Sequence, residues 1–393
     1  MINSVEFYAG VCTDNKLYCM EKHCNAVLSI DLDSAYLDYR GSLKNEEVFM
    51  QLPFTNAEIW KKKIIYIPYY ARYVHVYDME DGTDSIIQCN EENFQRDKYS
   101  IVFWDNDRCY MLPFTGDFIW EIDIERQKIS RKMNIRQNLM IQGVQYDVFS
   151  VCDVYQYDNV FYVAMYDQPY IVEINLRQNI VYLSELTGVQ GGIMSITGSE
   201  NKLYLLSRGK SVIIYSINEK KIEKSYNLNV DLNIFLTKAT VFNNHVYFAE
   251  VARQDFIDYD IENNKAVYSN FVSEWGIKDA IEEQFRFVCV EEGTKVVLIS
   301  DRLKLAIYDL ITRRINSRVL KYDKKNIKHK MAEIYEHNSS HINYEYNIWN
   351  FSVWMECSRI VTDGKQDSGI GAQIWGKVKG TGRVNNAWNT STS

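Results

Sequence analysis

The segment "IMSITGSENKLYLLSRGKSVIIYSINEKKIEKSY" (residues 193–226) decides the fold of this chain. It contains four short apolar or alternating stretches, at residues 193–196, 203–206, 212–215 and 222–226. Between them lie turns rich in Gly, Ser, Asn and Lys, as expected for consecutive antiparallel strands joined by hairpins. The segment therefore predicts one four-stranded antiparallel sheet.

The same unit recurs along the chain. A second strand carrying a Tyr is followed 12 or 13 residues later by a third strand that ends on Asp or a small polar residue. The first positions are Tyr18, Tyr66, Tyr110, Tyr162, Tyr204, Tyr247 and Val297. The second positions are Asp31, Asp78, Asp123, Asn175, Ser216, Asp260 and Asp309. Because the spacing is constant within a unit and varies from 41 to 52 residues between units, we predict repeated sheets joined by loops of different length.

Seven units of four strands predict an all-β fold, a seven-bladed β-propeller of four-stranded antiparallel blades over residues 1–323. The second strands at 15–18 and 201–204 and the hairpin turns at 78–82, 260–265 and 309–314 resemble the repeats of kelch and quinoprotein-like propellers. The Gly-Gly and Trp of kelch repeats are absent. The resemblance implies the propeller fold, which carries adaptors, lectins, oxidases and lyases alike.

Other segments break the strand pattern. Residues 273–285 have apolar side chains at helical spacing after a Ser, which predicts a short helix inserted between the sixth and seventh blades. Residues 324–361 predict a C-terminal helix and one extra strand packed on the propeller. Residues 362–393 are rich in Gly and contain no Tyr, which favours a flexible tail.

Charge and cysteine usage limit the partners and the compartment. A net charge of -8 disfavours nucleic acid as a partner, and the basic stretch 313–333 is expected to be a solvated face or, in one alternative, a scaffold surface for a protein partner. The first residues do not resemble a signal peptide, and no apolar run is long enough for a membrane span. The eight scattered cysteines favour buried free thiols. We expect a cytoplasmic monomer that contacts no membrane.

A ligand site is expected where the loops between second and third strands meet the connections between blades. These loops gather cations and aromatic rings, which suit an anionic or glycan-like small molecule or a protein partner. The predicted ligand-binding residues are Tyr69, Tyr70, Arg72, Asp117, Tyr166, Arg208, Arg253 and Arg302. The chain lacks the short motifs of nucleotide, zinc and hydrolase sites, so we expect no cofactor and no metal. The favoured function is non-catalytic binding.

An enzyme is the alternative. The first strand of each blade lines the ring axis, and two of these strands carry Glu58 and Asp153. A pair of carboxyl groups can act as general acid and general base in a lyase or hydrolase that cleaves a glycan or another small anionic substrate. His23 and Tyr166 complete this alternative catalytic set. Convergence of these side chains with shifted pKa values would favour the enzyme.

Overall fold

A computed structural model describes most of the first 323 residues. The described ranges are 7–21, 24–46, 54–89, 91, 94, 98–105, 108–144, 149–228, 237–250, 255–270, 285–291, 293–300 and 303–323. Residues 273–284 of the predicted helix, the helix and strand predicted within 324–361 and the tail 362–393 lie outside the described residues. The last residue of the predicted helix, Phe285, is the first residue of a strand. In the part of the chain that is described, no helix has the length and apolar character needed to cross a membrane.

The described strands form seven four-stranded antiparallel sheets, so the predicted seven-bladed propeller is confirmed. Blade 1 consists of β1 (Phe7–Thr13), β2 (Lys16–Glu21), β3 (Cys24–Asp31) and β4 (Tyr36–Gly41), and blade 2 of β5 (Phe54–Trp60), β6 (Lys63–Pro68), β7 (Val74–Asp78) and β8 (Asp84–Ile87). Blade 3 consists of β9 (Lys98–Asp105), β10 (Arg108–Thr115), β11 (Phe118–Asp123) and β12 (Lys128–Asn134). Blade 4 consists of β13 (Val151–Tyr157), β14 (Val160–Met165), β15 (Tyr170–Asn175) and β16 (Ile180–Glu185). Blade 5 consists of β17 (Ile193–Ser199), β18 (Lys202–Ser207), β19 (Ser211–Ser216) and β20 (Lys221–Asn227). Blade 6 consists of β21 (Thr237–Phe242), β22 (His245–Glu250), β23 (Asp255–Asp260) and β24 (Lys265–Asn270). Blade 7 consists of β25 (Phe285–Glu291), β26 (Lys295–Ser300), β27 (Lys304–Asp309) and β28 (Arg314–Val319).

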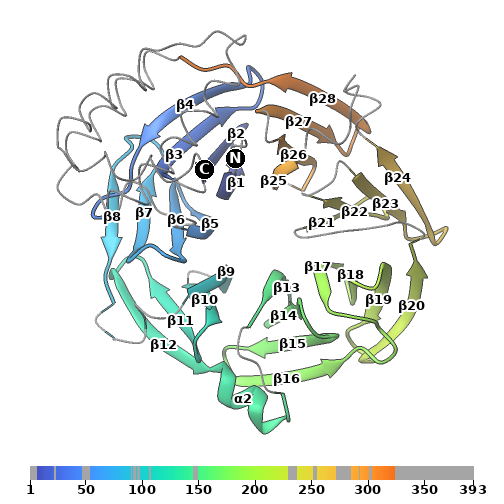
Figure 1. Cartoon of the computed structure of the whole chain (residues 1–393). Helices are drawn as coiled ribbons and strands as arrows, with labels where there is room; N and C mark the ends of the chain where they lie inside the picture. The colour runs from blue at the N-terminus through green and yellow to red at the C-terminus, as the bar shows by residue number, and fades with distance from the viewer. Residues whose placement is uncertain are drawn as a thin grey trace, which may run out of the picture.

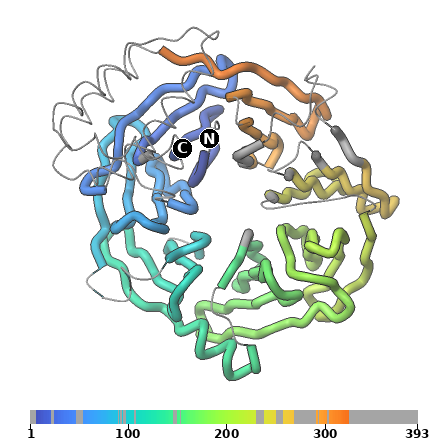
Figure 2. Tube along the Cα trace, in the orientation of Figure 1, coloured from blue at the N-terminus to red at the C-terminus, as the bar shows by residue number. Residues whose placement is uncertain are grey.

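The blades surround one axis, with the first strand of each blade innermost (Figure 1). The chain passes once around the ring, so the first and last blades are neighbours (Figure 2), and β1 contacts β25. After β28 the chain returns to β4, where the Lys321 amide donates to Ala35 O at 2.8 Å and the Leu37 amide donates to Lys321 O at 2.7 Å. These bonds fasten the end of blade 7 to the outermost strand of blade 1.

Both recurring sequence positions have one structural role in every blade. The first positions all lie buried in second strands. Each second position is the last residue of a third strand, and its side chain accepts a hydrogen bond from an amide two or three residues later. Four residues after it, every turn has a residue with positive φ: Ala35, Gly82, Gln127, Asn179, Lys220, Asn264 and Arg313. The repeated Asp or polar residue therefore fixes the hairpin that leads to the outermost strand.

The core is divided among the blade interfaces. Seven hydrophobic clusters among the described residues each join two neighbouring sheets, such as Leu17 with Val297 between blades 1 and 7. Burial of these faces gives the ring its stability. A helix that the sequence pattern did not predict, α2 (Ile135–Ile141), follows blade 3. Its N-cap is Asn134, whose side chain accepts a hydrogen bond from the Gln137 amide.

Candidate functional site

An aromatic patch lies on the face of the disc where second strands end and third strands begin. Tyr69 and Tyr70, in the β6–β7 loop, meet edge to face with ring centroids 4.9 Å apart. Tyr69 also packs against Phe114 of β10 at 5.5 Å. Lys98 Nζ, from the start of β9, lies 4.0 Å from the centroid of Tyr70 and 4.9 Å from that of Tyr69. The two predicted tyrosines thus form one patch with Lys98 and Phe114, and Tyr70 remains 49% exposed.

A second pair of predicted residues also converges. The Arg208 guanidinium lies 4.6 Å from the ring centroid of Tyr166, and its Nη1 is 3.1 Å from Asp167 Oδ1. The Arg208 amide donates to Gly192 O at 2.8 Å. A Cβ at Gly192 would lie 1.8 Å from Tyr166 O, so only glycine allows these two loops to approach so closely. Blades 4 and 5 therefore share a cation held over an aromatic ring.

The remaining predicted ligand-binding residues have other surroundings. Asp117, in the β10–β11 turn, pairs with Arg136 Nε at 2.8 Å and accepts the Ile135 amide through its carbonyl oxygen. It thereby holds the start of α2. The Arg72 amide donates to Glu46. Arg253, Arg302 and the alternative catalytic His23 lie outside the described residues.

An axial cluster is formed by three charged side chains from the innermost strands of blades 2, 4 and 6: Glu58, Asp153 and Lys238. Lys238 Nζ lies 3.0 Å from Asp153 Oδ1, across a gap of 85 positions in the sequence. The Asp153 side chain also accepts from the Val154 amide at 3.0 Å. The lysine side chain is 42% exposed and that of Asp153 is 12% exposed. Solvent therefore reaches this ion pair from the lysine side.

Glu58 completes the axial cluster electrostatically. Burial raises its pKa to about 7; the positive charge of Lys238 opposes this rise and the negative charge of Asp153 adds to it. Burial likewise raises the pKa of Asp153, although Lys238 lowers it. Within the described residues, no cation lies within ion-pair distance of the Glu58 carboxyl, and its hydrogen bond is to the Ile59 amide. The two predicted carboxyl groups therefore interact electrostatically, together with Lys238, which the sequence did not predict.

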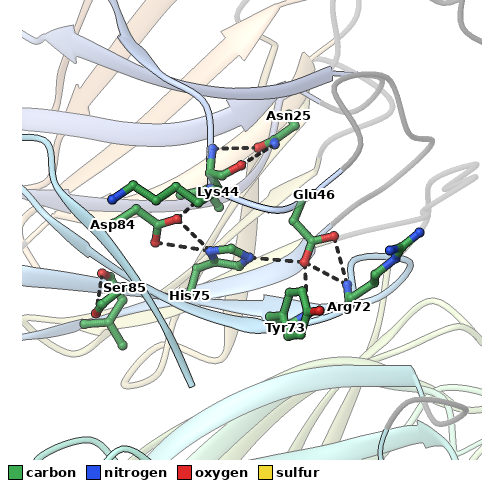
Figure 3. Close-up of polar contacts among 10 residues, drawn as sticks. Asn25, Lys44, Glu46, Arg72, Tyr73, His75, Asp84 and Ser85 are labelled. Carbon is green, nitrogen blue, oxygen red and sulfur yellow. Dashed lines mark hydrogen bonds and ion pairs between the residues drawn. The ribbon is translucent and has the colours of Figure 1, made fainter. Parts of the chain in front are cut away.

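A blade-2 cluster of three buried groups is hydrogen-bonded to the end of the loop that carries Tyr69 and Tyr70. It consists of Glu46 in the connection between blades 1 and 2, His75 of β7 and Asp84 of β8 (Figure 3). His75 Nδ1 is 2.9 Å from Asp84 Oδ2, and its Nε2 is 3.2 Å from Glu46 Oε1. The Glu46 carboxylate accepts the amides of Arg72 and Tyr73 at 2.8 and 2.9 Å. The end of the loop that carries Tyr69 and Tyr70 is thus hydrogen-bonded to the buried Glu46 carboxylate.

Three of these functional candidates had weak signals in the sequence. Lys98 and Lys238 occupy ordinary strand positions, and Glu46 lies in a connection of irregular sequence. Their partners come from other blades or from a distant part of the same blade, so no local spacing reveals them. Across the described ranges, no group of three or more His, Cys, Asp and Glu side chains is arranged to hold a metal ion.

Comparison with known proteins gives the fold. No family model and no curated protein sequence matches the chain. Among solved structures, a catalytically inactive variant of virginiamycin B lyase from Staphylococcus aureus with quinupristin is 13% identical over 77% of this chain and 94% of that chain, with a TM-score of 0.59. Saccharomyces cerevisiae Sqt1 is 8% identical over 81% and 86%, with a TM-score of 0.56. The computationally designed Ika8 protein is 10% identical over 80% and 87%, with a TM-score of 0.53.

These likenesses support a β-propeller repeat fold. At such low identity they carry nothing on ligand or activity. The resemblance to kelch repeats in particular stays a prediction.

Proposed function

We propose that this protein is a non-catalytic binding propeller that takes an anionic, ring-bearing ligand, such as a sugar acid or acidic glycan, on the aromatic patch. The observation that carries the proposal is Tyr70, which is 49% exposed yet fixed by contacts with Tyr69 and Lys98. An aromatic ring already held in place loses little conformational freedom when a ligand binds to it. Its open area suits the apolar side of a sugar ring.

Lys98 supplies the preference for negative charge. The guanidinium groups of Arg136, in α2, and Arg208, in the β18–β19 loop, are already paired with Asp117 and Asp167. The Lys98 ammonium instead contacts two rings, and within the described residues no carboxylate lies within ion-pair distance of it. A carboxylate or sulfate group on the ligand would form a charge-assisted hydrogen bond with this ammonium.

The test is a thermal-shift screen of sugar acids, acidic oligosaccharides and acidic peptides, followed by calorimetric titration of each hit. A ligand that binds only the folded protein raises its apparent stability. We expect Tyr70→Ala and Lys98→Met each to weaken binding about five- to thirtyfold, since each removes a contact worth about 1 to 2 kcal/mol. The matched control is Tyr182→Ala on β16, because Tyr182 is 51% exposed and Lys220 Nζ lies 5.0 Å from its ring centroid.

Unchanged affinity in Tyr70→Ala and Lys98→Met, or an equal loss in Tyr182→Ala, contradicts the proposal. So does a screen in which neutral sugars shift the melting temperature as much as acidic ones.

A second candidate function is acid–base catalysis at the axial cluster. It is favoured by the pKa of about 7 for Glu58, which lets this carboxyl donate or accept a proton near neutral pH. Lys238, half-exposed beside Asp153, could hold a negative charge that develops on a substrate. The fold leaves room for this candidate, because virginiamycin B lyase shares it. Elimination or hydrolysis of an acidic glycan that disappears in Glu58→Gln and persists in Tyr70→Ala supports the enzyme.

A further inference from the structure

The protonation state of His75 follows from its two neighbours. The ring is fully buried, and its two nitrogens face different carboxylates, Asp84 on one side and Glu46 on the other (Figure 3). A neutral imidazole has one N–H and one lone pair. In that form, one lone pair would face a carboxylate oxygen at about hydrogen-bond distance, which is repulsive. When both neighbours are carboxylates, both contacts are satisfied only if the ring carries two hydrogens and a positive charge.

Electrostatics agree with this geometry. Burial lowers the pKa of His75, but the hydrogen bonds to Asp84 and Glu46 and the charges of both carboxylates outweigh it, so the pKa is raised above 6.5. Among the described residues, Tyr73, whose ring centroid is 6.4 Å away, and Tyr66, the cross-strand neighbour on β6, are further titratable groups near the ring. The Arg72 guanidinium points away from it (Figure 3).

The same three groups join two separate segments of backbone. Glu46 accepts the amides of Arg72 and Tyr73, at the end of the loop that begins with Tyr69. Asp84 accepts the Lys44 amide at 2.7 Å. The buried Asn25 of β3 exchanges two hydrogen bonds with the Leu43 backbone, which fixes the other end of this connection. The imidazolium is therefore the centre of a clamp between residues 43–46 and residues 69–73.

We propose that His75 is a positioning residue whose positive charge holds the 69–73 loop, and with it the aromatic patch, in the form that binds ligand. Loss of the ring proton leaves two buried carboxylates without their cation, and Glu46 then releases the amides of Arg72 and Tyr73. Ligand binding at Tyr70 falls as the pH rises, although His75 itself touches no ligand. The part of this inference that concerns ligand rests on the proposed function, and the clamp does not.

The direction of the pH effect is fixed by the raised pKa. A histidine with a higher pKa in the folded protein than in the unfolded chain contributes stability that is complete below the unfolded pKa of 6.5. That contribution is lost as the pH rises through the folded pKa. The loop is thus expected to be closed in mildly acidic solution and to open toward alkaline pH.

Hydrogen exchange of the intact protein tests the clamp without any ligand. The rate of amide hydrogen exchange is measured at each pH from 6 to 9 for a peptide covering residues 69–73 and for one covering residues 207–211, the corresponding loop of blade 5. The first rate is then divided by the second. The division removes the intrinsic acceleration of exchange with pH. The blade-5 loop is held by the Arg208 amide bond to Gly192 and by the Ser211 amide bond to the Ser207 hydroxyl, with no histidine. The ratio is expected to be constant near pH 6 and to rise at least about tenfold above the folded pKa.

Three variants make the test specific. Glu46→Gln keeps an oxygen that accepts the amides of Arg72 and Tyr73 but removes one negative charge from His75, and Asp84→Asn does the same on the other side. Each is expected to move the midpoint of the ratio to lower pH. Glu173→Gln removes an equally buried carboxylate in blade 4 and leaves the midpoint where it is in the unaltered protein.

The outcomes separate cleanly. A rise in the unaltered protein that moves to lower pH in Glu46→Gln or Asp84→Asn supports the clamp, and so does a rise seen only in these two variants. A ratio that stays flat in all of them overturns it, as does a midpoint that moves equally in Glu173→Gln. Binding of a hit from the acidic-sugar screen is then measured over the same pH range. A pH-dependent loop with no bound sugar at any pH rejects the proposed function and keeps the clamp.

Discussion

The blade-2 cluster and the axial cluster contain the same charges, two carboxylates and one cation, in two different states. In the blade-2 cluster all three side chains are almost inaccessible, and both nitrogens of the cation face a carboxylate. In the axial cluster the lysine is half-exposed, and Glu58 is coupled to it only at longer range. A buried network whose members are all satisfied fixes a structure, whereas an incomplete one that solvent reaches can exchange a proton or a ligand.

The largest expected effect is that of His75→Gln. It leaves Glu46 and Asp84 buried without a cation, which costs about 3–5 kcal/mol when both are ionised. Urea unfolding at pH 7 measures this loss. His245→Gln is the control, because His245 contacts Asp258 and Arg313 near the surface, and we expect it to lose about 1 kcal/mol or less.

Glu58→Gln is expected to act in the opposite direction. Burial raises the pKa of Glu58 to about 7, so its ionised form destabilises the folded protein. This penalty is absent below the ordinary pKa of 4.5, grows as the pH rises from there to about 7, and is complete above 7. The variant should therefore be more stable than the unaltered protein by about 1–2 kcal/mol at pH 8 and about equal to it in acid. The control is Glu173→Gln, which removes a carboxylate that has partners, so this variant should be destabilised at pH 8. If both variants lose the same stability, Glu58 is not the incompletely paired carboxyl group that the comparison requires.

A smaller effect is expected from Lys238→Met. Because the ammonium is 42% exposed, solvent already screens the pair, and the loss at pH 8 should be about 1 kcal/mol. The pKa of Asp153 should rise further, since Lys238 lowers it in the unaltered protein. Lys220→Met breaks a similar pair with Glu173 at the rim and should leave the titration of Glu58 and Asp153 unchanged. Carboxyl NMR titrations of both variants check this difference.

The fold was predictable because its signals are local. An Asp such as Asp309 at the end of a third strand caps its own hairpin turn, so its role appears at a fixed spacing in every repeat. Tyr204 and its equivalents mark buried second strands for the same reason. Helix α2 was missed because seven residues between two strands give too short a periodic pattern.

The candidate site was predictable only in part. Tyr69, Tyr70, Tyr166 and Arg208 lie on loops whose place in the repeat is known, and the structure brings them together in pairs. Glu58 and Asp153 lie on inner strands for the same reason. Their common cation could not be predicted, because it depends on how far each inner strand is shifted along the axis relative to the others.

The most direct measurement is an NMR titration of the His75 ring in the intact protein, with its signals assigned by their absence from His75→Gln. The predicted result is an imidazolium with both nitrogens protonated at pH 7 and a midpoint above the ordinary value of 6.5. A neutral ring at pH 7 with a midpoint below 6.5 would contradict the distinction between a closed, ionised cluster in blade 2 and an open one at the axis.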